Sequence, residues 1–169
     1  MNNKDNDSSR NESSRNESFM REAIDLAVEN VRTGRGGPFA AVVVRDGEII
    51  ARATNTVTTS NDPTAHAEVN AIRQACSVLN DFQLEQCDIY TTCEPCPMCL
   101  GAIYWARPRR VYFGATREDA AAAGFDDAMI YREIGCTPEE RTLPMEQMLR
   151  REAQASFVAW QEKNDRVDY

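Results

Sequence analysis

The residues best suited to chemistry in this sequence are one histidine and a pair of closely spaced cysteines. His66 is the only histidine, and two residues separate Cys96 from Cys99, a spacing that lets two thiolates bind one metal ion. One imidazole and two thiolates leave the fourth position of a tetrahedral zinc ion open for water or hydroxide, as a catalytic zinc requires. We therefore expect one Zn²⁺ per subunit, held by these three side chains.

Glu68 lies two residues after the histidine and is the expected proton carrier. Residues two apart on a helix do not face each other, so His66 and Glu68 are poorly placed to bind the same ion. We expect His66 to bind the metal, and Glu68 to accept a proton from the metal-bound water and return protons to the substrate. The pattern His-x-Glu followed by Pro-Cys-x-x-Cys is typical of zinc-dependent deaminases of nucleic-acid bases.

The other cysteines leave two alternatives to a catalytic zinc. Cys93 could be the fourth protein ligand of a structural, non-catalytic zinc module, which would leave Glu68 without a role. The spacing of Cys93, Cys96 and Cys99 also resembles an iron–sulfur site, although such clusters are commonly held by four cysteines. We expect neither alternative, and we expect the four cysteines outside the zinc site to be ordinary core thiols: Cys76, Cys87, Cys93 and Cys136.

Charge and composition restrict the partners and the location. At 169 residues the chain has the length of one domain, and its net charge of −8 opposes binding to nucleic acid, which depends on basic groups. A small neutral substrate fits better. No run of about 18 apolar residues predicts a membrane span, and the polar N-terminus lacks the apolar segment of a secretory signal. Crowded cysteines suit metal binding in a reducing compartment, so we expect a cytoplasmic protein.

Hydrophobic periodicity and turn residues predict the elements that position these groups. Pro63 and Pro97 are each suited to the first position of a helix, which places His66, Cys96 and Cys99 in the opening turns of two helices. The expected order begins with a helix over 20–31, strands over 39–44 and 48–54, a helix from Asp62 to Leu79, a strand over 87–92, a helix over 97–107 and a strand over 110–115. Short helices near 120–134 and a helix over 151–164 follow. Residues 143–149 fit either a short strand, which we favour, or the start of a helix.

This order predicts an α/β protein, a three-layer α/β/α sandwich on a mixed five-stranded sheet. The strands over 87–92 and 110–115 are joined by a crossover helix and should be parallel. Residues 1–18 repeat Ser-Ser-Arg-Asn-Glu and carry no apolar residue after Met1, so we expect a disordered polar tail before a single zinc-dependent domain over 19–169.

Three segments closely resemble bacterial guanine deaminases of the cytidine deaminase superfamily. They are Asn61 to Glu68, the run from Cys93 to Trp105, and Gly124-Phe-Asp-Asp127, and the resemblance covers about residues 19–169. It implies a cytidine deaminase-like fold and hydrolysis of guanine at C2 to xanthine and ammonia, as in purine catabolism. It also implies a homodimer in which the C-terminal segment is domain-swapped.

The resemblance further implies roles for residues that would otherwise be ordinary turn, core or tail residues. Asn55 would hydrogen-bond the purine edge, with a backbone contact from Ala67 beside it, and Phe39 would stack on the ring. Asp127 would contact guanine and assist proton transfer. Trp105 would line the pocket, and Tyr169 would close it from the partner subunit.

Two other substrate classes share the zinc pattern. A tRNA adenosine deaminase would need a basic face for its RNA, and the acidic balance opposes it. Another small base, such as cytosine, remains an alternative to guanine.

Overall fold

The computed structural model describes residues 4–168, with side chains described from residue 12 onward. It divides the chain into two compact units, Met1–Asp127 and Ala128–Tyr169, each of which is described by itself. Within residues 4–168, no helix combines the length and apolar character needed to cross a membrane.

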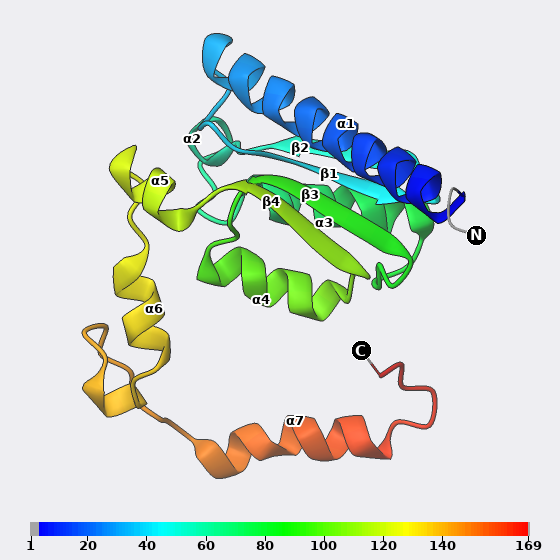
Figure 1. The fold of residues 1–169 in the computed structure, drawn as a ribbon. Coiled ribbons are helices and arrows are strands. Elements are labelled where there is room, and N and C mark those ends of the chain that lie inside the picture. The colour runs from blue at the N-terminus through cyan, green and yellow to red at the C-terminus, as the bar shows by residue number, and fades with distance from the viewer. Residues whose placement is uncertain (1–3, 169) are drawn as a thin grey trace. The chain divides into compact units, whose positions relative to one another are not determined.

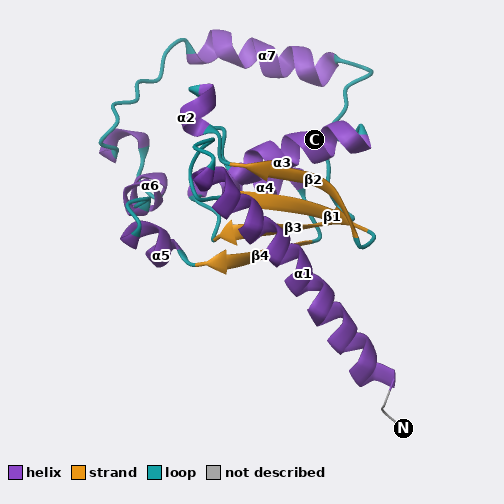
Figure 2. Ribbon diagram, turned by 90° about the horizontal axis from the view of Figure 1, so that it is seen from above, coloured by secondary structure: helices purple, strands orange, loops and turns teal. Residues whose placement is uncertain are grey.

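The first unit is built on a mixed sheet with the strand order β2-β1-β3-β4 (Figure 2). Its strands are β1 (Ala40–Arg45), β2 (Glu48–Thr54), β3 (Cys87–Cys93) and β4 (Arg110–Ala115). β1 pairs antiparallel with both β2 and β3, whereas β3 and β4 are parallel, as expected for strands joined by a crossover helix. Asp46 and Gly47 form the predicted two-residue hairpin turn, and both have the positive φ that such a turn requires.

Helices cover both faces of this sheet, which gives the predicted three layers (Figure 1). α1 (Lys4–Arg32) packs on one face, and α3 (Ala67–Leu79) and α4 (Pro97–Ala106) pack on the other. Alternate residues of β1 point to opposite faces, so Val43 is buried toward α3 while Val42 is buried toward α1. β1 is therefore apolar on both faces, as expected for a strand covered by helices on each side.

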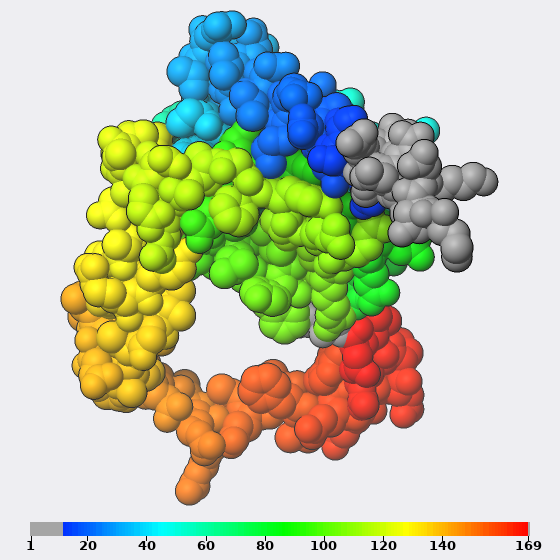
Figure 3. Space-filling view, in the orientation of Figure 1, coloured from blue at the N-terminus to red at the C-terminus, as the bar shows by residue number. Residues whose placement is uncertain are grey.

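The first helix starts earlier than the sequence analysis expected. Residues 1–18 were predicted to be a disordered tail. Residues 1–3 lie outside the described residues, and α1 begins at Lys4, within the predicted tail. From residue 12 onward, the side chains of α1 form a ridge on the first unit (Figure 3). The Asn16 carboxamide accepts a hydrogen bond from the Tyr90 hydroxyl at 2.7 Å and donates one to the Tyr112 hydroxyl at 3.2 Å. Phe19 packs against Tyr90 with ring centroids 5.3 Å apart. These contacts with the sheet hold a polar segment that has few apolar residues of its own.

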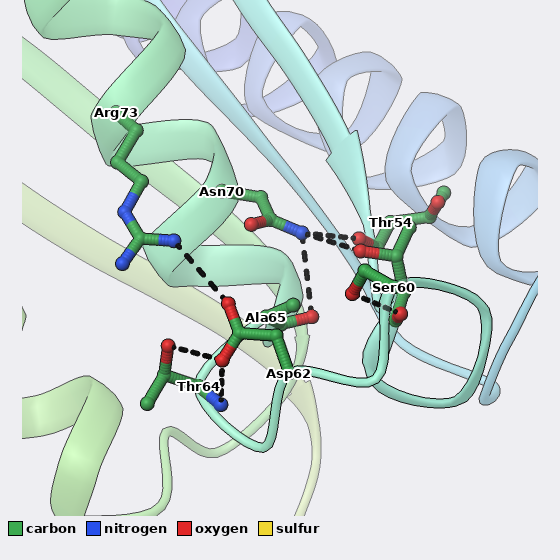
Figure 4. A network of polar contacts seen from close by, with 8 residues as sticks. Thr54, Ser60, Asp62, Thr64, Ala65, Asn70 and Arg73 are labelled. Carbon is green, nitrogen blue, oxygen red and sulfur yellow. Dashed lines mark hydrogen bonds and ion pairs between the residues drawn. The ribbon is translucent and has the colours of Figure 1, made fainter.

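The loop before α3 also differs from the prediction. A helix was expected to open at Asp62, but α3 begins at Ala67 with His66 as its N-cap residue. The Asp62 carboxylate instead accepts hydrogen bonds from the backbone N–H and the hydroxyl of Thr64, at 2.8 and 2.7 Å (Figure 4). This local turn competes with helix formation, which is a known tendency of aspartate. A short helix, α2 (Val57–Ser60), precedes it.

The prediction of a fifth strand over 143–149 is wrong, because the described residues form a sheet of four strands. Pro144 lacks the backbone N–H that a strand interior needs, and the segment is exposed and leads directly into α7 (Arg150–Glu162). The remaining helices are α5 (Arg117–Ala122) in the first unit, and α6 (Ala128–Ile134) and a 3₁₀ turn (Pro138–Glu140) in the second.

Candidate active site

Two helix N-termini bring the predicted metal ligands together. His66 immediately precedes α3, Cys96 immediately precedes α4, and Cys99 lies in the first turn of α4. Both helices pack on the same face of the sheet, and the ligand atoms at their N-termini lie close together. Partial positive charge at the start of a helix stabilises thiolate, which suits cysteine ligands in these positions.

The three ligand atoms have the spacing of a zinc site. His66 Nδ1 lies 3.5 Å from Cys96 Sγ and 3.4 Å from Cys99 Sγ, and all three atoms lie within 4.8 Å of one another. A tetrahedral zinc ion, with bonds of about 2.3 Å to sulfur and about 2.05 Å to nitrogen, holds such atoms about 3.6 Å apart. The donor set and its spacing therefore fit zinc with one position left for a non-protein ligand.

The electrostatics of the group favour a cation. The close approach of the Cys99 side chain lowers the pKa of Cys96 well below its usual value, and the same contact raises the pKa of Cys99. The same Cys96 sulfur, hydrogen-bonded to the imidazole, raises the pKa of His66. The Cys96 sulfur thus carries negative charge readily, and a bound divalent ion would also favour loss of the Cys99 proton.

Glu68 lies beside the ligands but is not one of the grouped metal-binding residues. It sits in the first turn of α3 with only 6% of its surface exposed, and its Oε2 accepts a hydrogen bond from Cys99 Sγ at 3.5 Å. Burial disfavours its charged form and raises the pKa of the carboxyl group. A carboxyl group whose pKa is raised toward neutrality can both accept and donate protons, as general acid–base catalysis requires.

Cys93 is not one of the grouped metal ligands, although it lines the same cavity as His66 and Cys96. Its thiol donates a hydrogen bond to the Thr116 carbonyl at 3.5 Å, and burial raises its pKa to about 11. Among residues 12–168, whose side chains the structure describes, His66, Cys96 and Cys99 form the one group of three or more candidate ligands close enough to share an ion. This geometry does not support a four-ligand structural zinc or an iron–sulfur cluster.

A cavity of about 550 Å³ opens onto His66, Glu68 and Cys96. Its size is within the range of small-molecule sites. Phe39, Asn55 and Asp127, which the resemblance assigned to substrate binding, all line it. The pKa of Asp127 is raised by partial burial and by the nearby charge of Cys96.

Comparison with known proteins agrees with this geometry. Residues 13–115 match the family model described as the cytidine and deoxycytidylate deaminase zinc-binding region. The chain belongs to this deaminase family. It is 57% identical over 151 residues to guanine deaminase from Bacillus subtilis, covering 89% of this chain and 97% of that protein. The X-ray structure of guanine deaminase from Bacillus subtilis matches with a TM-score of 0.88, over 90% of this chain and 98% of that one.

A second type of deaminase shares a shorter part of the sequence. The tRNA-specific adenosine deaminase of Agrobacterium fabrum is 51% identical over 78 residues, which is 46% of this chain and 51% of that protein.

The site roles that the resemblance gave to Trp105 and Tyr169 stay predictions. Trp105 lies on α4 with 64% of its surface exposed and is not among the described residues that line the cavity, and Tyr169 lies outside the described residues. Ala67 is fully buried at the start of α3, between the metal ligand His66 and Glu68. Its place in the chain is compatible with a backbone contact to a substrate in the cavity.

One wall of the deaminase cavity was missed by sequence reasoning. Phe125 lines it and packs edge-on against Phe39, with ring centroids 4.9 Å apart and an interplanar angle of 83°. The run Gly124-Phe-Asp-Asp127 was noted as part of the resemblance, but only its last residue was given a role. The signal in the sequence was the position of Phe125, two residues before Asp127, which had itself been assigned to the site.

Proposed function

We propose that this deaminase hydrolyses guanine to xanthine and ammonia. The observation that carries the proposal is the joint placement of the zinc-type ligands, the buried Glu68 carboxyl and an aromatic-walled cavity in the first unit. Similarity over 97% of a guanine deaminase, compared with about half of a tRNA-specific adenosine deaminase, supports guanine as the substrate. The net charge of −8 is also better suited to a small neutral base than to RNA.

Guanine would be held by an aromatic ring, an amide, a backbone group and a carboxyl group at the cavity. The Phe39 ring offers an apolar face on which a purine can stack, and the Asn55 side chain offers an amide to its polar edge. Ala67 would add a backbone contact beside Asn55. Asp127, whose pKa is raised, would hydrogen-bond the base and assist proton transfer.

The reaction needs one proton carrier beside the metal. Bound zinc would supply a Lewis acid that lowers the pKa of water toward neutrality. Glu68 would accept one proton as the water oxygen bonds to C2 of guanine and pass it to the ring nitrogen. It would then accept the second proton from the hydroxyl group now on C2 and pass it to the departing amine. The bond between C2 and the exocyclic amine nitrogen would break, ammonia would leave, and the carbonyl of xanthine would form at C2. Glu68 must not coordinate the metal during these steps, and it is not one of the residues in the ligand group.

The test is ammonia release by the zinc-loaded protein given guanine, adenine, cytosine or a tRNA anticodon stem-loop in parallel. We expect rapid release from guanine alone. Release from the stem-loop instead would leave the zinc chemistry intact and overturn the substrate. Zinc-bound protein that is inactive on all four would contradict guanine and favour another base or a structural metal.

We also propose that the active form is a homodimer in which the segment from Ala128 onward is exchanged between subunits, within a deaminase domain over 19–169. Residues 128–169 form a separate compact unit, which is the organisation that exchange requires. α7 exposes 68% of Phe157, and α4 of the first unit exposes 76% of Tyr104. Apolar surface of this kind is typical of subunit interfaces. We place the protein in the cytoplasm, where its thiol ligands stay reduced.

Changes at Tyr169 should reduce activity more than loss of the N-terminal residues. Deleting Tyr169, or adding residues after it, is expected to lower kcat/KM for guanine by roughly 10–100-fold, because the proposed closure of the partner's cavity is lost. Removing residues 1–11, which leaves the Asn16 contacts in place, should have little effect. Steady-state kinetics on the three proteins make the comparison, and equal tolerance of both changes would count against the exchanged lid.

A further inference from the structure

Asn30 is a buried polar residue near the end of α1 that no proposed step of the reaction uses. It is only 3% exposed, and its Nδ2 donates hydrogen bonds to the backbone carbonyls of Gly37 and Asn55, each at 2.9 Å. These two bonds use both hydrogens of the amide. The opposite amide orientation would place Oδ1 against two carbonyl oxygens, so the hydrogen-bond network fixes which atom faces them.

The two carbonyls belong to neighbouring parts of the cavity wall. Gly37 and Asn55 both line the cavity, and the Asn55 N–H donates to the Phe39 carbonyl at 2.9 Å. The loop is packed so closely that a Cβ on Gly36 would collide with the Asn55 carbonyl oxygen. Asn30 therefore ties together the two backbone segments that carry Phe39 and Asn55.

A second asparagine, Asn70, binds the carbonyl of Thr54, the residue before Asn55, from the other face of the sheet. Asn70 of α3 donates to the Thr54 carbonyl at 3.1 Å and to the Ala65 carbonyl at 3.3 Å (Figure 4). The consecutive carbonyls of Thr54 and Asn55 are thus held by amides from helices on opposite faces. With the backbone fixed on both sides, the Asn55 side chain has little freedom to leave the cavity wall.

Asn30 has a feature that its hydrogen bonds alone do not explain. Its Oδ1 is buried and has no hydrogen-bond partner among the described residues. Burying an unpaired acceptor destabilises the folded state, so stability alone would not favour asparagine here. The two donated bonds to the cavity wall are what the residue contributes.

We infer that Asn30 is a positioning residue for the substrate, acting through the backbone of Asn55 and the adjoining Gly37–Phe39 segment. This inference rests on the proposed function, in which Asn55 and Phe39 contact the base. Asn30 does not touch the base itself. Removing its amide lets the wall relax, so the Asn55 amide and the Phe39 ring no longer meet guanine in the productive geometry.

The test compares Asn30→Ala and Asn30→Ser with Asn16→Ala by steady-state guanine kinetics, zinc content and thermal unfolding. Asn16 is the matched control, because it is an α1 asparagine that also makes two side-chain hydrogen bonds to the sheet but is not among the described cavity-lining residues. Serine keeps one donor and is the milder change if alanine prevents folding. We expect the Asn30 variants to keep zinc and to raise KM on the order of tenfold, with kcat changed less, whereas Asn16→Ala lowers only the unfolding temperature.

A double-mutant cycle with Asn55→Ala separates positioning from general loss of stability. If Asn30 acts through Asn55, then Asn30→Ser should raise KM much less in the Asn55→Ala background than in the unchanged protein. Equal KM increases in both backgrounds, an unchanged KM in Asn30→Ser, or a similar KM increase in Asn16→Ala would each overturn the inference. Absence of guanine turnover by the unchanged protein would instead overturn the proposed function.

Discussion

Replacing Glu68 with glutamine is expected to lower kcat for guanine deamination by about 10²–10⁴-fold, while one zinc ion per chain is retained. Glutamine has nearly the same shape and can remain in the buried position beside Cys99, but it cannot accept and return a proton. Because Glu68 is not one of the metal ligands, its substitution should leave the metal in place. Ammonia release and metal analysis on the same preparation measure both quantities.

The matched control for this prediction is Glu85→Gln, which removes the same charge from an exposed loop. It should retain both zinc and activity. Zinc loss in Glu68→Gln would show that the carboxylate is a ligand, and retention of full activity would assign Glu68 no part in proton transfer. Either result would contradict the mechanism.

Replacing Cys99 with serine is expected to remove both zinc and activity. Cys99 is fully buried, and its sulfur lies 3.4 Å from His66 Nδ1 within the ligand group. Loss of a residue that only supports a ligand typically weakens metal binding 10–100-fold, so loss of a thiolate ligand should weaken zinc binding by more than about 100-fold. Zinc per chain after dialysis against a weak chelator measures the effect.

Cys93→Ser is the matched substitution, since Cys93 and Cys99 are both buried and lie three residues on either side of Cys96. The Cys93 thiol bonds to the Thr116 carbonyl rather than to the ligand group, so this variant should keep its zinc. Equal zinc loss in the two variants would restore the four-ligand structural site that the geometry argues against.

The metal ligands and the proton carrier could be predicted because their signals are local. The spacing from Cys96 to Cys99, and from His66 to Glu68, lies within one or two helical turns, where backbone geometry fixes which side chains can converge. The Asp46-Gly47 turn was predictable for the same reason, because a two-residue hairpin depends on the φ angles that those residues accept. These spacings need no knowledge of distant parts of the chain, but the approach of His66 to Cys96 and Cys99, which are 30 and 33 residues away, depends on the packing of α3 and α4.

Other features depend on contacts between residues far apart in the sequence. A polar segment was expected to be disordered, but the Asn16 hydrogen bonds to Tyr90 and Tyr112 join parts of the chain that are 74 and 96 residues apart. Residues 143–149 were expected to form a fifth strand, but a strand needs a paired neighbour, and the described residues form a sheet of four strands.

The sequence by itself therefore determined the reaction chemistry, through ligand types and spacing that short-range backbone geometry holds in place. The tertiary structure decided which additional residues shape the site. It placed Cys93 against Thr116, Phe125 against Phe39, and the Asn30 amide against the Asn55 carbonyl. Each of these contacts forms only when the helices and loops pack around the sheet, because packing brings together side chains whose spacing in the sequence carries no signal.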